Sequence, residues 1–336
     1  MKSLIRTSEQ PAQAPTKAAG SLPTGHQSSD QPRAIVGVVG LGHMGETFAL
    51  NFAADGHRIL AFDRDPARAA ALQSAGVEAA TMLGELSACD AIVTSLPDDD
   101  VVSAVVHHTG GLLDVMRPGA VHISMSTISP GLSRRLAAEH AARGQQYVAA
   151  PVLGNPDLAR ARKLFVLAAG RADGMESARP LLERLGQRLF PLGDEAGNAN
   201  LMKLAGNVLT ALTLESMGEV LALLRKSGVD QRAAFDVLTN SLFDSKVHRT
   251  YGGKIVEERY SPAGMAVPLA VKDLRLALAE AEREAVPMPA ASLVHDRLVA
   301  LIAAGHAELD WSALGLLAAR DAGLLTAGDG KSTSHR

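Results

Sequence analysis

The sequence predicts an α/β fold, in which an N-terminal domain with a doubly wound, mostly parallel sheet is followed by an all-α C-terminal domain. A short apolar segment at 35–39 runs directly into a glycine-rich turn. Short apolar segments then alternate with helical segments up to about residue 194, and no convincing strand follows. Strands that alternate with helices form mostly parallel sheets with right-handed crossovers, which gives the N-terminal half its predicted class.

Short apolar and β-branched runs, bounded by turn residues, predict strands at 35–39, 58–62, 91–95, 120–125, 147–150, 164–169 and 188–191. Helices are expected between them, two of them beginning with proline, at 45–54, 66–75, 98–107, 130–142 and 175–185. In the C-terminal half we expect a long helix at 198–227, and the composition of 219–224 and 270–285 is strongly helical.

Four segments follow from this pattern. Residues 1–33 are rich in Gln, Ser, Pro, Ala and Thr and lack the apolar centre of a secretory signal, so we expect a disordered tail. The α/β domain covers 34–194, the helical domain covers 195–326, and 327–336 form a second tail. The helical domain is expected to supply the substrate site and a dimer contact.

Composition narrows the function classes. Hydrophobic residues make up 47% of the 336 residues, enough to bury the cores of two domains. Lys and Arg number 33 against 36 Asp and Glu, so no basic excess predicts a nucleic-acid partner. No uninterrupted apolar run is long enough to predict a membrane span. The one cysteine, Cys89, excludes an intramolecular disulfide and a Cys-rich zinc site, and suits a cytoplasmic location.

The glycine-rich turn has the sequence Gly40-Leu41-Gly42-His43-Met44-Gly45, a G-x-G-x-x-G between a strand and a helix. Gly40 permits the tight turn, Gly42 lets the backbone approach a pyrophosphate, and Gly45 permits close packing of helix on strand. The helix N-terminus then offers unpaired N–H groups to the phosphates. The backbone of His43 and Met44 is expected to matter more than their side chains. The turn predicts a Rossmann-type dinucleotide site.

Two signals bear on which dinucleotide binds. Asp63 ends the second strand, where a carboxylate accepts hydrogen bonds from ribose hydroxyls and favours NAD. Arg64 follows it and Arg68 lies one helical turn on, where guanidinium groups can bind the 2′-phosphate of NADP. Both arginines could equally be solvated surface residues. Leu96 and Pro97 end another strand at the same edge of the sheet and should line the cofactor site.

Taken together, the motifs resemble the β-hydroxyacid dehydrogenases, the group that contains 3-hydroxyisobutyrate dehydrogenase, tartronate semialdehyde reductase and glyoxylate/succinic semialdehyde reductases. The resemblance covers roughly 35–325. Its motifs, in chain order, are GLGHMG at 40–45, SLPDDDVV at 95–102, STISP at 126–130, APVLG at 150–154, GNANLMKLAGN at 197–207 and KDLRLAL at 272–278.

The resemblance implies a role for each matched residue. Lys203 corresponds to the catalytic lysine and Asn207 to the asparagine that helps to hold the substrate. The other implied residues are Ser126, Thr127, Gly154 and Asn155 at the substrate and Lys272 near the cofactor. Independently, the spacing of four places Lys203 and Asn207 on one face of an otherwise apolar helix, where a buried lysine needs a partner or a function.

Other interpretations of these residues stay open. Ser126 could be a helix cap, although Ser129 before Pro130 is the better cap candidate. Lys272 and Asp273 could form an exposed pair that contributes little. The basic segment 160–163 is interpreted as a solvated face.

The sequence departs from the family pattern at three positions. Leu153 replaces a hydroxyl residue and Asn155 a glycine in the substrate loop, and Gly206 replaces the first of two asparagines. A site with fewer hydrogen-bond donors is expected to accept a bulkier or less polar substrate than a small 3-hydroxy acid.

We therefore expect an NAD(P)-dependent oxidoreductase that transfers hydride between nicotinamide and a 3-hydroxy acid or semialdehyde-like carbonyl, with Lys203 as general acid and base. NADP(H) is slightly favoured over NAD(H), because Arg64 stands where related enzymes place a phosphate-binding arginine. The alternatives are an imine reductase, which Lys203 argues against, and a non-catalytic dinucleotide-binding module. No metal is expected. The long helix and the resemblance predict a homodimer or a dimer of dimers.

Overall fold

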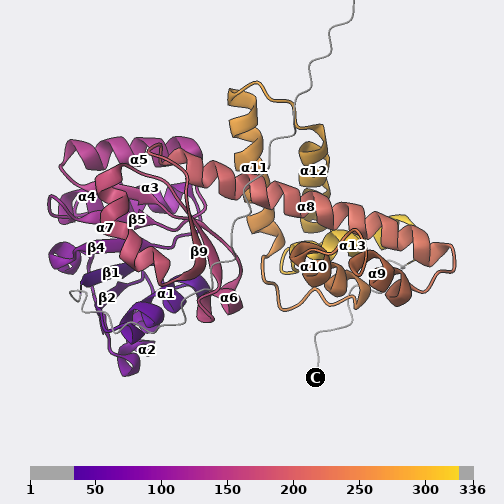
Figure 1. Cartoon of the computed structure of the whole chain (residues 1–336), viewed down its shortest axis with the longest axis horizontal. Helices are drawn as coiled ribbons and strands as arrows, with labels where there is room; N and C mark the ends of the chain where they lie inside the picture. Colours follow the sequence, from indigo (N-terminus) through magenta and orange to yellow (C-terminus); the bar gives the residue numbers. More distant parts are fainter. Residues whose placement is uncertain (1–33, 325–336) are drawn as a thin grey trace, which may run out of the picture. The chain divides into compact units, whose positions relative to one another are not determined.

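The computed structural model describes residues 34–324, which belong to one compact unit (Figure 1). The two tails expected at 1–33 and 327–336 lie outside the described residues. An α/β part comes first, and from Gly197 onward the described chain contains only helices and short turns, apart from one isolated bridge between Ala266 and Asp310. The predicted fold class is confirmed.

The main sheet has six parallel strands in the order β3-β2-β1-β4-β5-β6. The order reverses between β1 and β4, and ligands bind at the carboxyl edge of such a reversal. The strands are β1 (Ile35–Val39), β2 (Arg58–Phe62), β3 (Val77–Ala79), β4 (Ala91–Thr94), β5 (Val121–Ser124) and β6 (Gln146–Ala149). The strand β3 was not predicted, because its three residues include the charged Glu78.

The later strands form a second sheet, and here the single-sheet expectation was wrong. Its order is β7-β8-β9, comprising β7 (Val152–Leu153), β8 (Leu164–Ala168) and β9 (Gly186–Pro191). β7 runs antiparallel to β8, and β9 runs parallel to it. A strand of two residues leaves no periodic pattern, so the sequence carried no sign of β7.

Four of the seven helices described in the α/β part begin after a residue whose side chain accepts a hydrogen bond from the first turn. Ser129 accepts a hydrogen bond from the N–H of Leu132, which confirms it as the cap of α5, and Asp98 caps α3 in the same way. The helices are α1 (His43–Ala54), α2 (Pro66–Ala71), α3 (Asp99–His107), α4 (Leu112–Val115), α5 (Pro130–Ala142), α6 (Pro156–Arg160) and α7 (Ala172–Glu183).

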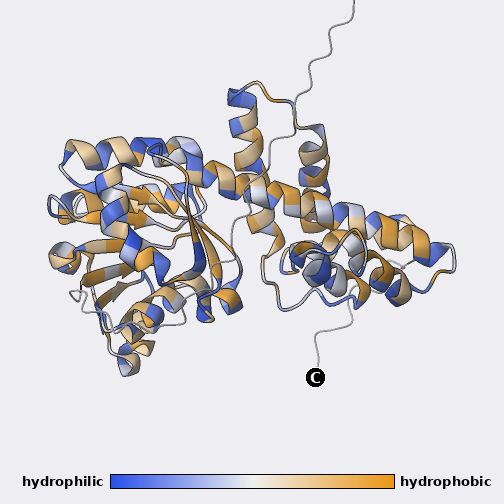
Figure 2. Cartoon of the chain, in the orientation of Figure 1, coloured by the Kyte–Doolittle hydropathy of each residue, from blue (hydrophilic) through white to orange (hydrophobic). Residues whose placement is uncertain are grey.

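Both faces of the main sheet are covered. Along β1, Val36 and Val38 belong to one buried apolar cluster and Val39 to the other, as the alternation of a strand requires. Figure 2 shows that hydrophobic residues dominate these strands.

The helical part is organised around α8 (Gly197–Lys226), the long helix that was expected at 198–227. It contacts α5, α9, α10, α11, α12 and α13. The remaining helices are α9 (Gln231–Thr239), α10 (Lys246–Val256), α11 (Val267–Arg283), α12 (Pro289–Ala303) and α13 (Leu314–Asp321). By length and composition α8 could cross a membrane, but half of its most apolar window is buried against these helices, as in the core helix of a globular domain.

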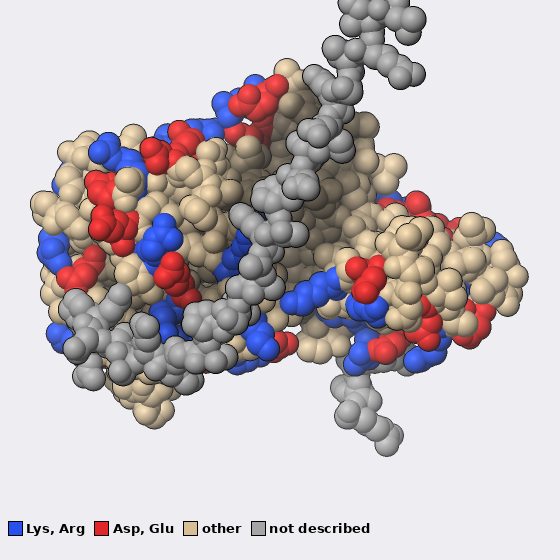
Figure 3. All heavy atoms as spheres, in the orientation of Figure 1, with Lys and Arg blue, Asp and Glu red and all other residues tan. Residues whose placement is uncertain are grey.

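The basic segment 160–163 is not uniformly solvated. Arg162 donates to the carboxylate of Asp55 at 2.7 Å and to the carbonyl of Asn51 at 2.8 Å. It therefore ties the end of α6 to the end of α1. On the face seen in Figure 3, basic and acidic residues are interspersed and no extended basic surface forms.

A chain of buried hydrogen bonds runs beneath α5. The amide nitrogen of Gln145 donates to two backbone carbonyls, so its oxygen accepts from Nδ1 of His140 at 2.7 Å. Nε2 of His140 then accepts from Nδ1 of His122 at 2.9 Å, and Nε2 of His122 accepts from the hydroxyl of Thr94 at 3.0 Å. This pattern is complete only when both imidazoles are neutral.

Candidate active site

The glycine turn has the geometry that a phosphate cradle requires. Gly40 has a φ of +87°, and a Cβ there would lie 2.5 Å from the carbonyl of Ser95. A Cβ on Gly45 would lie 1.8 Å from the carbonyl of Gly40, so only glycine permits this approach of α1 to the turn. A Cβ on Gly42 would meet no atom closer than 3.9 Å, because it faces open space at the N-terminus of α1. That space fits a pyrophosphate.

The carboxylate of Asp63 is bound to the turn. One oxygen accepts from the N–H of Leu41 at 2.7 Å, and the other accepts from the N–H of Asp65 at 2.9 Å. A guanidinium nitrogen of Arg68 lies 4.0 Å from the same carboxylate. Arg64 is exposed beside it. His43 is exposed at the first position of α1, and Met44 packs on the core.

A hollow of about 390 Å³ lies next to Arg64 at the carboxyl edge of the sheet. Apolar side chains from the end of β2 and from α3 line most of it, and Arg64 and Asp100 supply charges. Its lining residues are Phe62, Arg64, Leu83, Asp100, Val101, Ala104, Val105 and His108. The position and the lining suit a flat, mostly apolar ring such as a nucleobase.

Two loops at the same edge, one after β4 and one after β5, are tied to each other. The N–H of Leu96 donates to Oγ of Ser126 at 2.8 Å, and Ser126 is buried. Because its hydroxyl is used in this contact, Ser126 is not the cap of α5. Nδ2 of Asn200, in the first turn of α8, donates to the Ser126 carbonyl at 3.3 Å.

Lys272 of α11 anchors both loops to the helical part. Its Nζ donates to the carbonyl of Thr127 at 2.6 Å and to the carbonyl of Pro97 at 3.0 Å. Nζ also lies 3.0 Å from Oδ1 of Asp273. The side chains of Lys272 and Asp273 are only 13% and 4% exposed, which excludes the solvated pair.

Lys203 lies at the end of a polar chain that runs between α8 and α11. Its Nζ donates to Oδ1 of Asn207 at 3.2 Å, and Nδ2 of Asn207 donates to Oδ2 of Asp273 at 2.5 Å. Asn207 and Asp273 are buried. The oxygen of the Asn207 amide thus faces the lysine and its nitrogen faces the carboxylate, and these two contacts determine the orientation of the amide.

Burial lowers the pKa of the Lys203 ammonium, because the charged form loses its hydration. The carboxylate of Asp273 acts against this effect and the positive charge of Lys272 adds to it. An amine with a lowered pKa can exchange a proton with a bound alcohol or alkoxide more readily than an exposed lysine.

The predicted substrate loop has a structural role as well. Gly154 has a φ of +146°, and a Cβ there would lie 2.6 Å from Leu164, so the turn after β7 needs glycine. Oδ1 of Asn155 accepts from the N–H of Leu158 at 3.0 Å and caps α6. Its side-chain amide nitrogen donates to no other residue that the structure describes and can donate to a ligand.

Two contributors were not assigned a role from the sequence. Asp273 was noted only as the neighbour of Lys272, although it shares the buried stripe of α11 with Ala270, Leu274 and Ala277. An acid on an apolar stripe requires a partner, and that signal could have identified it. Asn200 left no such signal, since its contact with Ser126 joins residues that are 74 positions apart.

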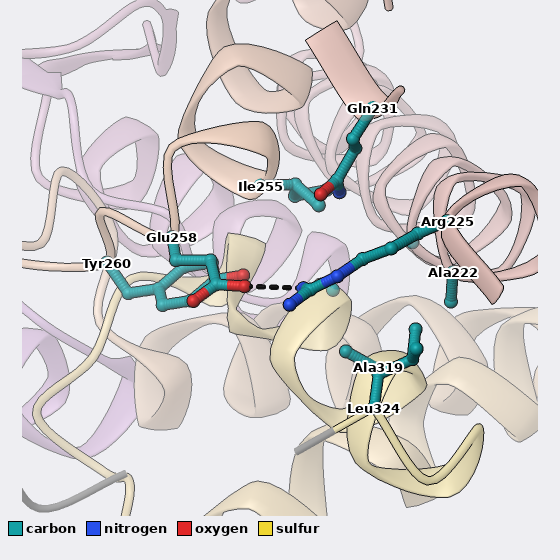
Figure 4. A pocket seen from close by; sticks show the side chains of 10 residues that line it. Ala222, Arg225, Gln231, Ile255, Glu258, Tyr260, Ala319 and Leu324 are labelled. Atoms are coloured by element: carbon teal, nitrogen blue, oxygen red, sulfur yellow. Dashed lines mark hydrogen bonds and ion pairs between the residues drawn. The ribbon is translucent and has the colours of Figure 1, made fainter. Parts of the chain in front are cut away.

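A second pocket lies at the other end of α8. Arg225 and Glu258 form an ion pair at 2.7 Å across it, and Tyr260 and Gln231 complete its polar lining (Figure 4). None of its lining residues belongs to the Lys203 chain. Among the described residues, no group of His, Cys, Asp and Glu side chains is placed to hold a metal.

Two family profiles match consecutive parts of the chain. The NAD-binding domain of 6-phosphogluconate dehydrogenase matches residues 35–193, and the NAD-binding domain of NADP-dependent 3-hydroxyisobutyrate dehydrogenase matches residues 197–317. The border between them falls in the turn that precedes α8.

Individual proteins agree with the profiles over most of the chain. The uncharacterized oxidoreductase YfjR of Bacillus subtilis is 38% identical over 83% of this chain and 98% of its own length. The 3-hydroxyisobutyrate dehydrogenase of Pseudomonas aeruginosa is 31% identical over 83% of this chain and 96% of its own. The solved 3-hydroxyisobutyrate dehydrogenase of Mycobacterium tuberculosis, determined with L-serine, superposes with a TM-score of 0.78 at 27% identity over 85% of this chain and 99% of its own. The chain therefore belongs to the β-hydroxyacid dehydrogenases, the NAD(P)-dependent oxidoreductases that act on hydroxy acids.

Proposed function

We propose that this enzyme interconverts a 3-hydroxy acid and the corresponding semialdehyde, with Lys203 as the general acid and base. The nicotinamide cofactor supplies or accepts the hydride. In the oxidative direction the neutral Lys203 amine takes the hydroxyl proton as the carbinol carbon loses its hydride. In the reductive direction the Lys203 ammonium returns that proton to the developing alkoxide. The observation that carries the proposal is the position of Lys203, which is partly buried, has a lowered pKa and is held by Asn207.

Asn207 and Asp273 are proposed to position the lysine. The carboxylate holds the amide nitrogen of Asn207, so the amide oxygen must face Lys203 Nζ. Asp273 also supplies a negative charge that favours the ammonium form. Lys203 can therefore carry its proton in spite of its burial, which the reductive direction requires.

Ser126, Thr127, Gly154, Asn155 and Asn207 are proposed to contact the substrate. The hydroxyl of Ser126 accepts from Leu96, and its own proton remains available for a carboxylate. Lys272 contributes indirectly, because it anchors the carbonyls of Pro97 and Thr127. Relatives support the substrate class, since their names include 2-(hydroxymethyl)glutarate dehydrogenase and 2-hydroxy-3-oxopropionate reductase.

The cofactor is proposed to rest its diphosphate on Gly40, Gly42 and Gly45 and its adenosine in the hollow beside Arg64. We favour NADP(H) over NAD(H). The carboxylate of Asp63 already accepts two backbone N–H groups, which leaves it fewer free lone pairs for ribose hydroxyls. Arg64 and Arg68 flank this position, where two guanidinium groups can bind a 2′-phosphate.

A cytoplasmic homodimer, or a dimer of dimers, is proposed as the working form. Several large apolar side chains of α8 are exposed in the single chain, among them Leu209 and Leu223, each 65% exposed. Exposed apolar surface of this kind is typical of subunit contacts. Light scattering of the purified chain would measure a multiple of the monomer mass if the proposal holds and the monomer mass if it fails.

The direct test of the reaction is a spectrophotometric assay at 340 nm. The full chain is incubated with NADP⁺ or NAD⁺ and a set of 3-hydroxy acids, and with the reduced cofactors and semialdehydes. We expect reversible turnover that is faster with the phosphorylated cofactor. Absence of turnover with every acid and aldehyde, in protein that binds the cofactor, would contradict the proposal.

A further inference from the structure

Asn200, in the first turn of α8, has a buried amide group that is bound at only one end. The residue is 0% exposed, and its Nδ2 donates to the carbonyl of Ser126 at 3.3 Å. Its Oδ1 is also buried and accepts a hydrogen bond from no donor that the structure describes. A buried acceptor without a donor is costly, so we searched for a donor that can reach it.

Asn200 lies on the same flank of α8 as Asn207. With about 100° between successive helical residues, Asn207 lies ~40° and Asn200 ~60° from Lys203 in the same direction. One precedes Lys203 by three residues and the other follows it by four, so both are its neighbours on the helix. Long side chains lean toward the N-terminus of a helix, which directs Lys203 to the turn that contains Asn200. The lysine therefore has a bound amide oxygen on one side along the helix and an unbound one on the other.

The ammonium group of Lys203 has donors that are not used. A lysine ammonium carries three N–H donors and no acceptor. One of them donates to Oδ1 of Asn207 at 3.2 Å, and Nζ makes no second hydrogen bond within residues 34–324. A group that is held by one bond still rotates about that bond. A second bond fixes the rotation, so that the remaining proton has one direction, as proton transfer to a bound oxygen requires.

We propose that Asn200 is a positioning residue for Lys203. With substrate bound, Oδ1 of Asn200 accepts the second N–H of the ammonium, and the third N–H faces the reacting oxygen. Asn200 also holds the carbonyl of Ser126, so one side chain positions both the lysine and the loop that is proposed to contact the substrate. The inference rests on the proposed role of Lys203 as general acid and base.

The pH dependence of alcohol oxidation tests the contact with two substitutions of opposite effect. The full-length enzyme is assayed with NADP⁺ and either 3-hydroxyisobutyrate or 3-hydroxypropanoate, and the rising limb of kcat follows the loss of the Lys203 proton. Asn200→Ala removes an acceptor from the ammonium, so the limb should move to lower pH. Asn200→Asp adds a negative charge without a change in size, so the limb should move to higher pH by about one unit. The charges that already act on Lys203, those of Asp273 and Lys272, are the same in both variants.

Asn198 provides the matched control on the same helix. It is exposed and lies ~140° from Lys203 in the opposite direction. Asn198→Ala and Asn198→Asp should therefore leave the limb at its wild-type position. Should Asn200→Ala fail to fold, Asn200→Asp, which has the same size as asparagine, tests the contact by the direction of its shift.

A double variant separates positioning from a structural effect. Asn200→Ala should lower kcat about tenfold in the wild-type enzyme, because the ammonium loses its fixed direction. In a Lys203→Ala background it should lower kcat no further, because the group that it positions is absent.

An equal loss in both backgrounds, or a limb that neither Asn200 variant moves, overturns this inference and leaves the role of Lys203 intact. Wild-type turnover by Lys203→Ala, or no turnover of either acid by the wild-type enzyme, counts against the proposed reaction itself and overturns the inference with it.

Discussion

Nδ2 of Asn207 donates to Oδ2 of Asp273 at 2.5 Å, and this bond joins two helices whose contacting residues are 66 positions apart. It determines the orientation of the amide, and the amide oxygen then accepts a hydrogen bond from Nζ of Lys203. Asp273 of α11 is therefore linked to Lys203 of α8, the proposed acid and base, through the side chain of Asn207. Two consequences follow, one for geometry and one for the pKa of the lysine.

Replacing the carboxylate should change the pH dependence as well as the rate. In Asp273→Asn the negative charge that raises the pKa of Lys203 is lost while burial still lowers it, so the pKa should fall further. The limb of the pH–rate profile for alcohol oxidation, which rises as Lys203 loses its proton, should move to lower pH. A loss of about a hundredfold in kcat is expected from the misplaced amine. A profile that keeps the wild-type position would show that Asp273 is not coupled to Lys203.

Alanine substitutions at two glycines of the turn should have different effects, one on cofactor binding and the other on the stability of the fold. Gly42→Ala places a methyl group in open space, so the melting temperature should stay near that of the wild type. Affinity for NADPH should nevertheless fall about tenfold or more, because the methyl group occupies the position proposed for the diphosphate. Isothermal titration calorimetry measures the affinity. If the Gly42→Ala variant binds NADPH with the affinity of the wild type, the diphosphate does not lie on this turn.

Gly45→Ala should act through folding instead. Its Cβ would lie 1.8 Å from the carbonyl of Gly40, so α1 must move away from the sheet. We expect a loss of about 3 kcal/mol in the free energy of unfolding, measured by urea denaturation. The matched control is Gly84→Ala, whose Cβ meets only the flexible end of Met82 at 3.8 Å. Equal stability of the two variants would contradict the close approach in the turn.

Cofactor preference should depend on Arg64. Removing a guanidinium that binds a phosphate costs about tenfold or more in affinity, whereas NADH offers no such phosphate. Arg64→Ala should therefore weaken NADPH binding strongly and leave NADH binding within about twofold. Fluorescence titration of both reduced cofactors provides the comparison. Equal weakening of both would indicate that Arg64 contacts a part the two cofactors share.

The buried imidazoles should make stability depend on acid. Burial lowers the pKa of His140 to about 4 and that of His122 well below its usual value, while the unfolded chain keeps values near 6.5. Below pH ~6.5 the unfolded state binds protons that the folded state does not bind. The free energy of unfolding therefore decreases as the pH is lowered. The contribution of His140 to this loss in the free energy of unfolding approaches about 3 kcal/mol near pH 4.

His140→Gln keeps a polar group in this place without a titrating ring. Urea denaturation of this variant between pH 7 and pH 4 should therefore show a shallower loss of stability than the wild type. His108→Gln, an exposed exchange just after α3, serves as the control and should follow the wild type. A His140→Gln variant with the wild-type slope would contradict the neutral imidazole chain.

Local patterns in the sequence predicted much of this structure. The G-x-G-x-x-G turn, the cap at Ser129 and the spacing of Lys203 and Asn207 each depend on residues within a few positions of one another. The features that escaped prediction join distant residues. The small second sheet, the contact of Asn200 with Ser126 and that of Leu153 with Gly206 arise only after the chain has folded back on itself. Arg162 was misjudged for the same reason, since its partner Asp55 is 107 positions away.

The central claim is that Lys203 moves the proton of the reaction. Its most direct test is the turnover of Lys203→Ala, compared with its binding of NADPH. We predict that kcat falls by a factor of about 10²–10⁴, the usual contribution of a general acid and base, while the dissociation constant of NADPH and the circular dichroism spectrum stay at wild-type values. Turnover at the wild-type rate by this variant would contradict the account.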